Sequence, residues 1–470
     1  MNKITFKELT DVCKIIKTQN ISDEDEFDYL RVIGLSAKYE EKAKNPLYFL
    51  SYTKEEEKGH GWYINNFDLR PYFNNICSEH PKYTYIIEPS MEKDANKDTK
   101  YIIVENINTT IDKIYEYILN RSKAKVIAFT GSVGKTTAVG LLEKALKEKY
   151  NVLRVYSKRI TPINLKANII NFLEKNIDYV ILENSLYYHD HVKILSTLLK
   201  PEIVSMLNIK SSHLGVEKLN SVDDICIYKA DIMRNAKYAY LNNNDSYLKN
   251  ITLDKGIVKY KGKELFENKN LQINYVNNKE LQVVDNCFLI NNNIKVEPFI
   301  LSALAGIQYL TCYKIAKKLG LTNEQIKKGL ENYMPVENRL NKKKAFGKEI
   351  IFDGDVTTYE RMNEIADTLY SKKYLVLRKV GSAENTFRIK NIVDFFSKFE
   401  KVFIFDDIDY LDELKKEKNV VIVSSNDFIK DLDGQIIYHY SGYYRVWDEF
   451  KEENLNIYDR EKYKIIKEND

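Results

Sequence analysis

The stretch from Val126 to Thr137 reads VIAFTGSVGKTT and decides the fold of this chain. Its apolar first half predicts a buried strand, its two glycines predict a tight loop, and the pattern over residues 138–148 predicts a helix. A strand, a glycine loop and a helix in this order form a binding site for phosphate groups. The sequence therefore predicts a nucleotide-binding domain around this loop.

The residue types in the loop suit phosphate chemistry. The glycines let backbone N–H groups converge on phosphate oxygens, and the start of the following helix attracts negative charge. Lys135 can reach the outer phosphates, while the hydroxyl of Thr136 can bind Mg²⁺. The residues expected to bind the nucleotide are Gly131, Ser132, Val133, Gly134, Lys135, Thr136 and Thr137.

Length and composition exclude several classes of protein. The 470 residues suggest about three domains, and the net charge of +4 gives no global field for nucleic acid or an anionic membrane. No window approaches 18 apolar residues, so we expect no membrane span. The five cysteines lack C-x-x-C spacing, which is typical of free thiols in a reducing compartment. We expect a cytoplasmic monomer.

The order of apolar runs predicts an α/β fold of three domains. Residues 1–122 form a smaller α/β region, opened by an amphipathic helix near 6–18. Residues 123–340 alternate strands and helices around the loop, as in a doubly wound, mostly parallel sheet, and include a small antiparallel patch at 252–300. Residues 341–470 form a Rossmann-like α/β domain, and the lysine run at 342–344 suggests a hinge before it.

Two strand ends beside the loop carry polar residues. Glu183 ends an apolar run, and Asn208 ends the next one, with His213 five residues later. Open parallel sheets place their sites at the carboxyl ends of strands, where carboxylate and imidazole groups can hold Mg²⁺. Taken alone, a residue such as Glu183 is more often a buried structural partner than a metal ligand, and a lone histidine is most often an ordinary core or surface residue.

Joined in order, these residues resemble the central domain of the Mur ligase family, the ATP-dependent amide ligases of peptidoglycan precursor synthesis. The resemblance rests on TGxxGKTT at 130–137, Glu183, Asn208, His213-Leu214, Lys229 and LNxxD at 241–245. It extends to LYFL at 47–50 and KGHGWYI at 58–64, which look like the first domain of members that add the third residue or the terminal dipeptide. As a whole, the sequence most resembles the type that adds D-alanyl-D-alanine to the tripeptide precursor, with a divergent C-terminal domain.

The resemblance implies a chemistry and a role for each residue. A carboxylate substrate, perhaps linked to a nucleotide, would attack the γ-phosphate of ATP to give an acyl phosphate, which an amine then converts to an amide. Lys135 would stabilise the transferring phosphoryl group, and Thr136 and Glu183 would hold one Mg²⁺. His213 would bind a second metal, together with Lys229, which stands where several members carry a carbamylated lysine. Arg339 and Asp353 would contact the nucleotide.

Two departures from the family pattern leave alternatives open. The dipeptide-adding members carry DDxYNANP after the first strand of the third domain, where this chain has DGDVTTYE at 353–360. We therefore expect either the cell-wall enzyme or a paralogue with another amine acceptor. The adenine-side pattern GxHN is absent around 301–308, which keeps open a catalytically weakened ATP-binding protein that needs a partner. The loop also looks like that of partitioning ATPases, but Thr130 replaces their signature lysine.

Overall fold

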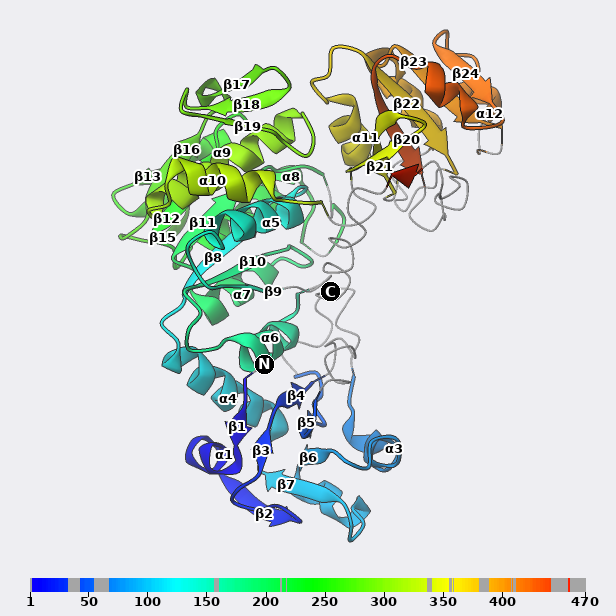
Figure 1. Ribbon diagram of the computed structural model, residues 1–470. Coiled ribbons are helices and arrows are strands. Elements are labelled where there is room, and N and C mark those ends of the chain that lie inside the picture. The colour runs from blue at the N-terminus through cyan, green and yellow to red at the C-terminus, as the bar shows by residue number, and fades with distance from the viewer. Residues whose placement is uncertain are drawn as a thin grey trace. The chain divides into compact units, whose positions relative to one another are not determined.

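The computed structural model describes residues 2–32, 43–54, 67–155, 160–211, 214–216, 218–335, 340–354, 357, 359–379, 389–406, 408, 411–440 and 455–456 (Figure 1). Their contacts divide the chain into two compact units. The first contains Met1–Lys135 and Lys149–Tyr275, and the second contains Thr136–Glu148 and Val276–Asp470. Each unit is an α/β structure, which confirms the predicted fold class.

The first sheet of the first unit has the strand order β2-β7-β6-β5-β4. Neighbours from β4 to β7 run parallel, and β2 joins β7 antiparallel. The strands are β2 (Ile15–Gln19), β4 (Tyr29–Arg31), β5 (Pro46–Phe49), β6 (Thr84–Ile87) and β7 (Lys100–Val104), and a separate pair is formed by β1 (Ile4–Thr5) and β3 (Glu26–Phe27). The α-helices of this part are α1 (Phe6–Val12), α3 (Phe73–Glu79) and α4 (Ile107–Arg121).

The predicted helix over 6–18 is wrong in its second half. Helix α1 ends at Val12, and residues Ile15–Gln19 form β2 instead. The helix begins with a capping box, in which Thr5 and Glu8 satisfy each other's backbone N–H groups. Ile15 and Lys17 then pair with Val104 and Ile103 across a register shift in the sheet, an interaction that helical periodicity in the sequence does not reveal.

The central sheet of the first unit has the order β16-β12-β11-β8-β10-β9. The pairs from β12 to β9 are all parallel. Its strands are β8 (Lys125–Thr130), β9 (Val152–Val155), β10 (Tyr179–Glu183), β11 (Ile203–Met206), β12 (Tyr238–Asn242) and β16 (Gln272–Val276). The α-helices of this region within the unit are α6 (Pro162–Phe172), α7 (His191–Leu199) and α8 (Val222–Ala230).

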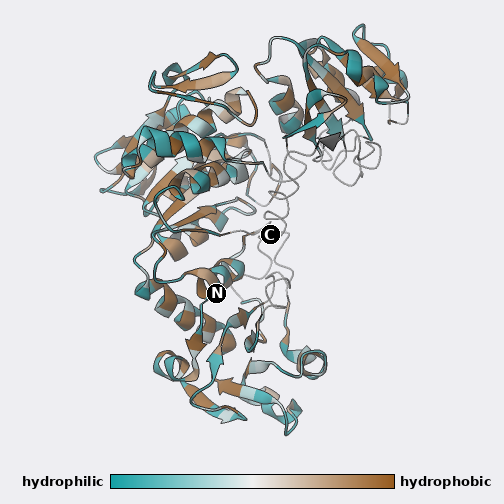
Figure 2. Cartoon of the chain, viewed as in Figure 1, coloured by the Kyte–Doolittle hydropathy of each residue, from teal (hydrophilic) through white to brown (hydrophobic). Residues whose placement is uncertain are grey.

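Apolar runs explain this sheet. In β8, β10 and β11 nearly every residue is buried, as expected of parallel strands covered on both faces. Figure 2 shows these strands mainly in brown, the colour of hydrophobic residues. The loops that carry polar residues therefore lie at the strand ends, where the sheet presents its site.

An asparagine of helix α6 is hydrogen-bonded to the edge of the first sheet. Asn171 of α6 accepts a hydrogen bond from Leu30 N at 2.8 Å and donates one to Leu30 O at 2.9 Å. It is fully buried and thus completes the backbone pairing of edge strand β4 with a side chain. Near it, Lys54 and Lys166 both form ion pairs with Asp112 of α4.

Two small antiparallel sheets confirm the predicted patch at 252–300. The first unit holds β13 (Ile251–Asp254), β14 (Ile257–Tyr260) and β15 (Lys263–Glu267), and the second holds β17 (Leu281–Val284), β18 (Cys287–Ile290) and β19 (Ile294–Val296). The second unit also contains α9 (Ala303–Lys318) and α10 (Asn323–Glu331), together with nearly all of α5 (Lys135–Leu146). Gly329 of α10 packs against the backbone of α5 at Ala145.

The last sheet has the order β24-β23-β22-β25-β21-β20-β26. Its strands are β20 (Asn341–Ala345), β21 (Lys348–Asp353), β22 (Lys373–Arg378), β23 (Lys401–Phe405), β24 (Val420–Val423), β25 (Gln435–Tyr440) and β26 (Leu455–Asn456). The five from β24 to β21 are parallel, and their helical connections are α11 (Tyr359–Ala366), η7 (Ile389–Lys398), α12 (Leu411–Leu414) and η8 (Asp427–Asp431).

The lysine run at 342–344 is a strand and not the predicted hinge. These residues belong to β20, which pairs antiparallel with β21 in register from Asn341 with Phe352 to Ala345 with Lys348. Lys343 is 8% exposed, so its side chain faces the sheet while that of Lys344 faces solvent. Successive side chains of a strand point to opposite faces of the sheet, so a strand can contain the lysine run that composition alone suggested to be a hinge.

Candidate active site

The phosphate loop, residues 131–134, follows β8 directly and leads into α5 at Lys135. Because β10 and β11 flank β8 in parallel, their carboxyl ends lie at the same edge as the loop. Gly134 has a φ of 81°, a left-handed conformation that favours glycine. Gly131 is close to β11, since a Cβ built on it would lie 3.2 Å from the Cβ of Leu207.

Asn208 fixes the conformation of the loop. Its Oδ1 accepts hydrogen bonds from Ser132 N at 3.1 Å and Val133 N at 3.0 Å, and its Nδ2 donates to Val133 O at 3.0 Å. The hydroxyl of Ser132 also accepts a bond from Lys210 N at 2.8 Å. Two amides that we predicted to face phosphate are thus engaged by the neighbouring strand end, and the loop is held in place before any ligand binds.

Two lysines converge on one carbonyl group of this loop. Lys135 Nζ donates to Gly131 O at 2.9 Å and to Ser132 O at 3.1 Å, and Lys229 Nζ donates to Gly131 O at 2.9 Å. Lys229 lies in α8 and is 1% exposed. Burial, and then the charge of Lys135, lower the pKa of Lys229 well below its ordinary value. The structure therefore favours a neutral amine at this position.

Glu183 is the last residue of β10 and pairs in register with Phe129 of β8. It is only half-buried, and its charge acts on Lys229 in the opposite sense to burial, raising that pKa. The structure thus brings together Lys135, Glu183 and Lys229 at the carboxyl edge of the sheet. Thr136 and Thr137 are the second and third residues of α5 and are also half-buried.

The donor set fits a nucleotide and a magnesium ion. No acidic residue stands in the first turn of α5, so the helix start keeps its attraction for anions. Thr136 and Glu183 each carry an oxygen of the kind that Mg²⁺ prefers, and phosphates and water ordinarily complete its coordination. Within the described ranges, no group of three His, Cys, Asp or Glu side chains could hold a metal by itself.

Some predicted residues lie outside the described residues. These are His213, Arg339 and the stretch 58–64 of the first domain. The residues of the LNxxD pattern are described and have structural contacts: Asn242 donates to Leu207 O at 2.9 Å, and Asp245 accepts bonds from Ile209 N, Tyr247 N and Leu248 N. They hold the end of β11 and therefore the position of Asn208.

Sequence reasoning missed a buried histidine near this edge. His191, the first residue of α7, is 1% exposed, and its Nε2 lies 2.8 Å from Ile160 O. Its ring stacks on Tyr188 at 5.0 Å between centroids and lies 5.1 Å from that of Tyr187. Burial lowers the pKa of His191 to about 4, so its imidazole is neutral at pH 7. The signal in the sequence that could have revealed it is the run of tyrosines and histidines at 187–191.

Asp353 lies in the second unit, at the end of β21, and is fully buried. Arg361 Nε donates to its Oδ2 at 2.9 Å and Arg361 Nη2 donates to its Oδ1. His439 Nδ1 lies 2.8 Å from Oδ2, and Leu340 N lies 3.3 Å from Oδ1. A carboxylate accepts about four hydrogen bonds. A nucleotide contact by Asp353 would therefore require one of these bonds to open.

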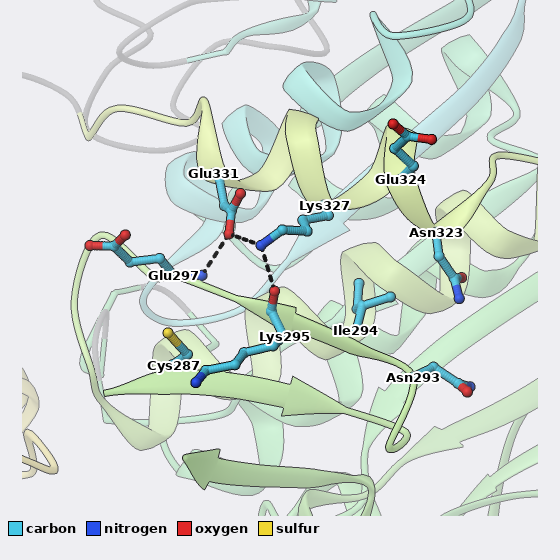
Figure 3. A pocket seen from close by; sticks show the side chains of 9 residues that line it. All are labelled: Cys287, Asn293, Ile294, Lys295, Glu297, Asn323, Glu324, Lys327 and Glu331. Atoms are coloured by element: carbon cyan, nitrogen blue, oxygen red, sulfur yellow. Dashed lines mark hydrogen bonds and ion pairs between the residues drawn. The ribbon is translucent and has the colours of Figure 1, made fainter. Parts of the chain in front are cut away.

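A cavity of about 530 Å³ in the second unit lies between β18–β19 and α10 (Figure 3). Glu331 accepts hydrogen bonds from Glu297 N at 3.0 Å and from Lys327, and Lys327 donates to Lys295 O at 2.7 Å. These lining groups already satisfy one another, and none of the predicted site residues lines the cavity. It therefore adds nothing to the candidate site.

Comparison with known proteins agrees with the site at the loop. Residues 129–304 match the family model described as Mur ligase middle domain. The UDP-N-acetylmuramoyl-tripeptide--D-alanyl-D-alanine ligase of Borreliella burgdorferi is 24% identical over 296 residues, which cover 60% of this chain and 61% of that ligase. The chain thus spans about three fifths of the length of this relative.

Solved structures show the same fold. The crystal structure of MurF from Acinetobacter baumannii superposes with a TM-score of 0.65 at 14% identity, covering 95% of this chain and 98% of that one. The MurF ligase from Thermotoga maritima in complex with ADP has a TM-score of 0.61 at 16% identity, covering 86% and 92%. At such identities the likeness establishes the fold. In the described part of the chain, no helix combines the length and the apolar character needed to cross a membrane.

Proposed function

We propose that this chain, whose residues 129–304 match the Mur ligase middle domain model, is an ATP-dependent ligase that joins a carboxylate to an amine. The observation that carries the proposal is the convergence of Lys135 and Lys229 on Gly131 O, at the edge where Glu183 ends its strand. Phosphoryl transfer needs positioning and charge neutralisation more than covalent help from the protein, and these residues supply both.

The proposed reaction has two steps. A carboxylate oxygen of the acid attacks the γ-phosphorus of ATP, and the bond to ADP breaks. The amine nitrogen then attacks the acyl carbon, the bond to phosphate breaks, and an amide forms. Lys135 leaves its loop carbonyl groups to neutralise charge on the transferring phosphoryl group. Asn208 keeps the loop rigid while this happens, because its bonds do not involve the ligand.

Magnesium would polarise the phosphoryl oxygens, with Thr136 and Glu183 as its protein ligands. Lys229 would contribute as a carbamate, since its neutral amine can add carbon dioxide and release a proton. Its lowered pKa and its burial support this role, because only the neutral amine reacts. His213 would complete the second metal site, and Arg339 would contact the nucleotide.

The substrates follow from the relatives by analogy. The named relative joins a UDP-N-acetylmuramoyl tripeptide to D-alanyl-D-alanine. We propose a large, nucleotide-linked carboxylate as the acid and a small amine-bearing peptide or amino acid as the acceptor. The sequence DGDVTTYE at 353–360 supports an acceptor other than D-alanyl-D-alanine.

The experiment is ADP and phosphate release by the purified protein with Mg²⁺-ATP. Pooled nucleotide-linked cell-wall precursors are combined with amino acids and dipeptides, and Lys135→Ala serves as the inactive variant. Release that needs both an acid and an amine supports the ligase. ATP binding without release in any pool would favour the catalytically weakened protein that needs a partner. Turnover retained in Lys135→Ala would contradict the proposed site.

A further inference from the structure

The strand β24 (Val420–Val423) lies at one edge of the last sheet (Figure 1). Among the described residues it pairs only with β23, in parallel and over its whole length. Its sequence VVIV is wholly apolar, which holds for no other edge strand of the described sheets. Val421 is 37% exposed and Ile422 is 43% exposed. Edge strands of monomers are ordinarily protected by charges, because an unprotected apolar edge pairs readily with another chain.

A hydrogen bond to β23 shows which backbone groups of β24 point away from the sheet. Val402 N donates to Asn419 O at 2.9 Å, so the backbone of Asn419 faces β23. The N–H and C=O groups of successive strand residues point alternately to the two sides. The backbone groups of Val421 and Val423 therefore also face β23. Those that face outward belong to Val420, Ile422 and Ser424.

These outward groups restrict how β24 can pair with a second β24. In a two-fold dimer both copies use the same surface, and because every second residue faces outward, the axis must pass beside a residue. An axis at Val421 would place Ile422 O against Val420 N of the other copy, which already donates to Glu417 O at 3.2 Å. An axis at Ile422 lets the two Ile422 residues exchange both backbone bonds. Only this second arrangement satisfies the N–H and the C=O of Ile422.

The side chains around this axis complement one another. The two Ile422 side chains would lie directly across from each other, and Val421 would lie across from Val423 of the other copy. Cross-strand pairs of β-branched residues stabilise strand pairing. Residues 415–418 read KKEK and precede the strand, whereas residues 424–433 follow it and contain three aspartates and one lysine. Antiparallel pairing therefore places the basic end of each strand beside the acidic end of the other.

We propose that β24 is the interface of a homodimer, in which two copies of this chain join their last sheets antiparallel about an axis at Ile422. The proposal is independent of the ligase function, and it differs from the monomer that we expected from the sequence. A pair of four-residue strands buries less than the roughly 1,200 Å² of a stable interface, so the dimer should be weak and reversible.

Sedimentation velocity of the full chain tests the interface at protein concentrations from about 1 µM to about 300 µM. We expect the wild type to shift from monomer to dimer as the concentration rises. Ile422→Lys should stay monomeric, because its two ammonium groups would lie together at the axis. The matched control is Val283→Lys, at a 45% exposed valine in β17, an edge strand of another sheet. Thermal melting checks that both variants are folded.

Cysteine substitution tests the position of the axis. In Ile422→Cys the two thiols lie across from each other, at a separation that a disulfide can span. In Val421→Cys the two thiols are offset along the strands by two residues. Under mild oxidation we expect the first variant to form a covalent dimer about 10-fold faster than the second. The wild type, treated in the same way, measures the background from the five native cysteines.

Three results would overturn the proposal. The first is a wild-type chain that stays monomeric over the whole range of concentration. The second is a dimer that persists in Ile422→Lys, since the contact would then lie elsewhere in the chain. The third is equal cross-linking of Ile422→Cys and Val421→Cys, which would reject an axis at Ile422.

Discussion

Lys135 and Lys229 place their side-chain nitrogens at the same distance, 2.9 Å, from the carbonyl oxygen of Gly131. Two ammonium groups this close would repel each other, and the repulsion contributes to the lowered pKa of the buried lysine. The pair therefore combines one half-buried cation with one fully buried amine, both held against the loop.

Lys229→Met should separate function from stability. The substitution removes a buried polar group, while Gly131 O keeps its bond from Lys135, so we expect the melting temperature to stay unchanged or rise. Turnover should fall by about 100-fold, in line with loss of a metal-site residue. Thermal melting and ADP release measure the two effects. The control is Lys125→Met, at a half-exposed lysine that starts β8. Full turnover in Lys229→Met would contradict the assignment.

Asn208→Ala should loosen the phosphate loop. Three side-chain hydrogen bonds to Ser132 and Val133 are lost. Val133 N is left without this acceptor, whereas Ser132 N keeps its bond to the backbone carbonyl of residue 208. We expect a stability loss of about 1–3 kcal/mol and weaker ATP binding. Asn208→Asp keeps the acceptor but places a negative charge beside the loop, so it should bind ATP less well than the alanine variant. Calorimetric titration with ATP measures both, and equal affinity in all three proteins would argue against a clamp.

His191 should make stability depend on pH. Its folded pKa of about 4 lies below the ordinary 6.5, so the unfolded chain binds more protons between these values and stability falls as the pH drops through that window. From pH 7.5 to pH 5 the free energy of unfolding should fall by about 2 kcal/mol because of this histidine. In His191→Gln this contribution should be absent over the same range. Urea unfolding at both values checks this, with partly exposed His80→Gln as the control.

Gly329→Ala should disturb the packing of α10 on α5. A Cβ at this position would lie 2.4 Å from the Cα of Ala145 and 2.6 Å from Lys144 O, both backbone atoms that cannot easily move. We expect a loss of about 1–3 kcal/mol, more than the gain in helix propensity. Gly306→Ala is the contrast, because its one close contact is with the end of the flexible Leu281 side chain, and the ring of Phe288 lies at an ordinary contact distance of 3.6 Å. A larger loss in Gly306→Ala would reverse this interpretation.

The sequence predicted the elements that carry strong local patterns. The strands β10 (Tyr179–Glu183) and β23 (Lys401–Phe405) can be recognised in the sequence, because each contains four consecutive apolar residues. Residues 15–19 and 342–344 were assigned wrongly, since their strands depend on partners far along the chain. Local patterns cannot supply such pairing.

The site shows the same limit. Lys135 and Glu183 could be placed because a loop motif and the end of a strand mark their positions, whereas Lys229 was implied only by the resemblance to the Mur ligase family. The clamp by Asn208 and the ring stack around His191 depend on which loops the fold brings together, so spacing did not reveal them. The hydrogen bonds between Asp353 and His439 and between His439 and Thr357 join residues more than eighty positions apart. They follow from the register of two parallel strands, which the sequence does not show.

The most direct test of the proposed ligase follows oxygen from the acid to the released phosphate. The acid is labelled with ¹⁸O in its carboxylate, and the phosphate formed with Mg²⁺-ATP and the amine is analysed by mass spectrometry. An acyl phosphate predicts one ¹⁸O atom in each phosphate, in step with amide formation. Phosphate without ¹⁸O would contradict the account, because ATP would then be cleaved by water and not by the acid.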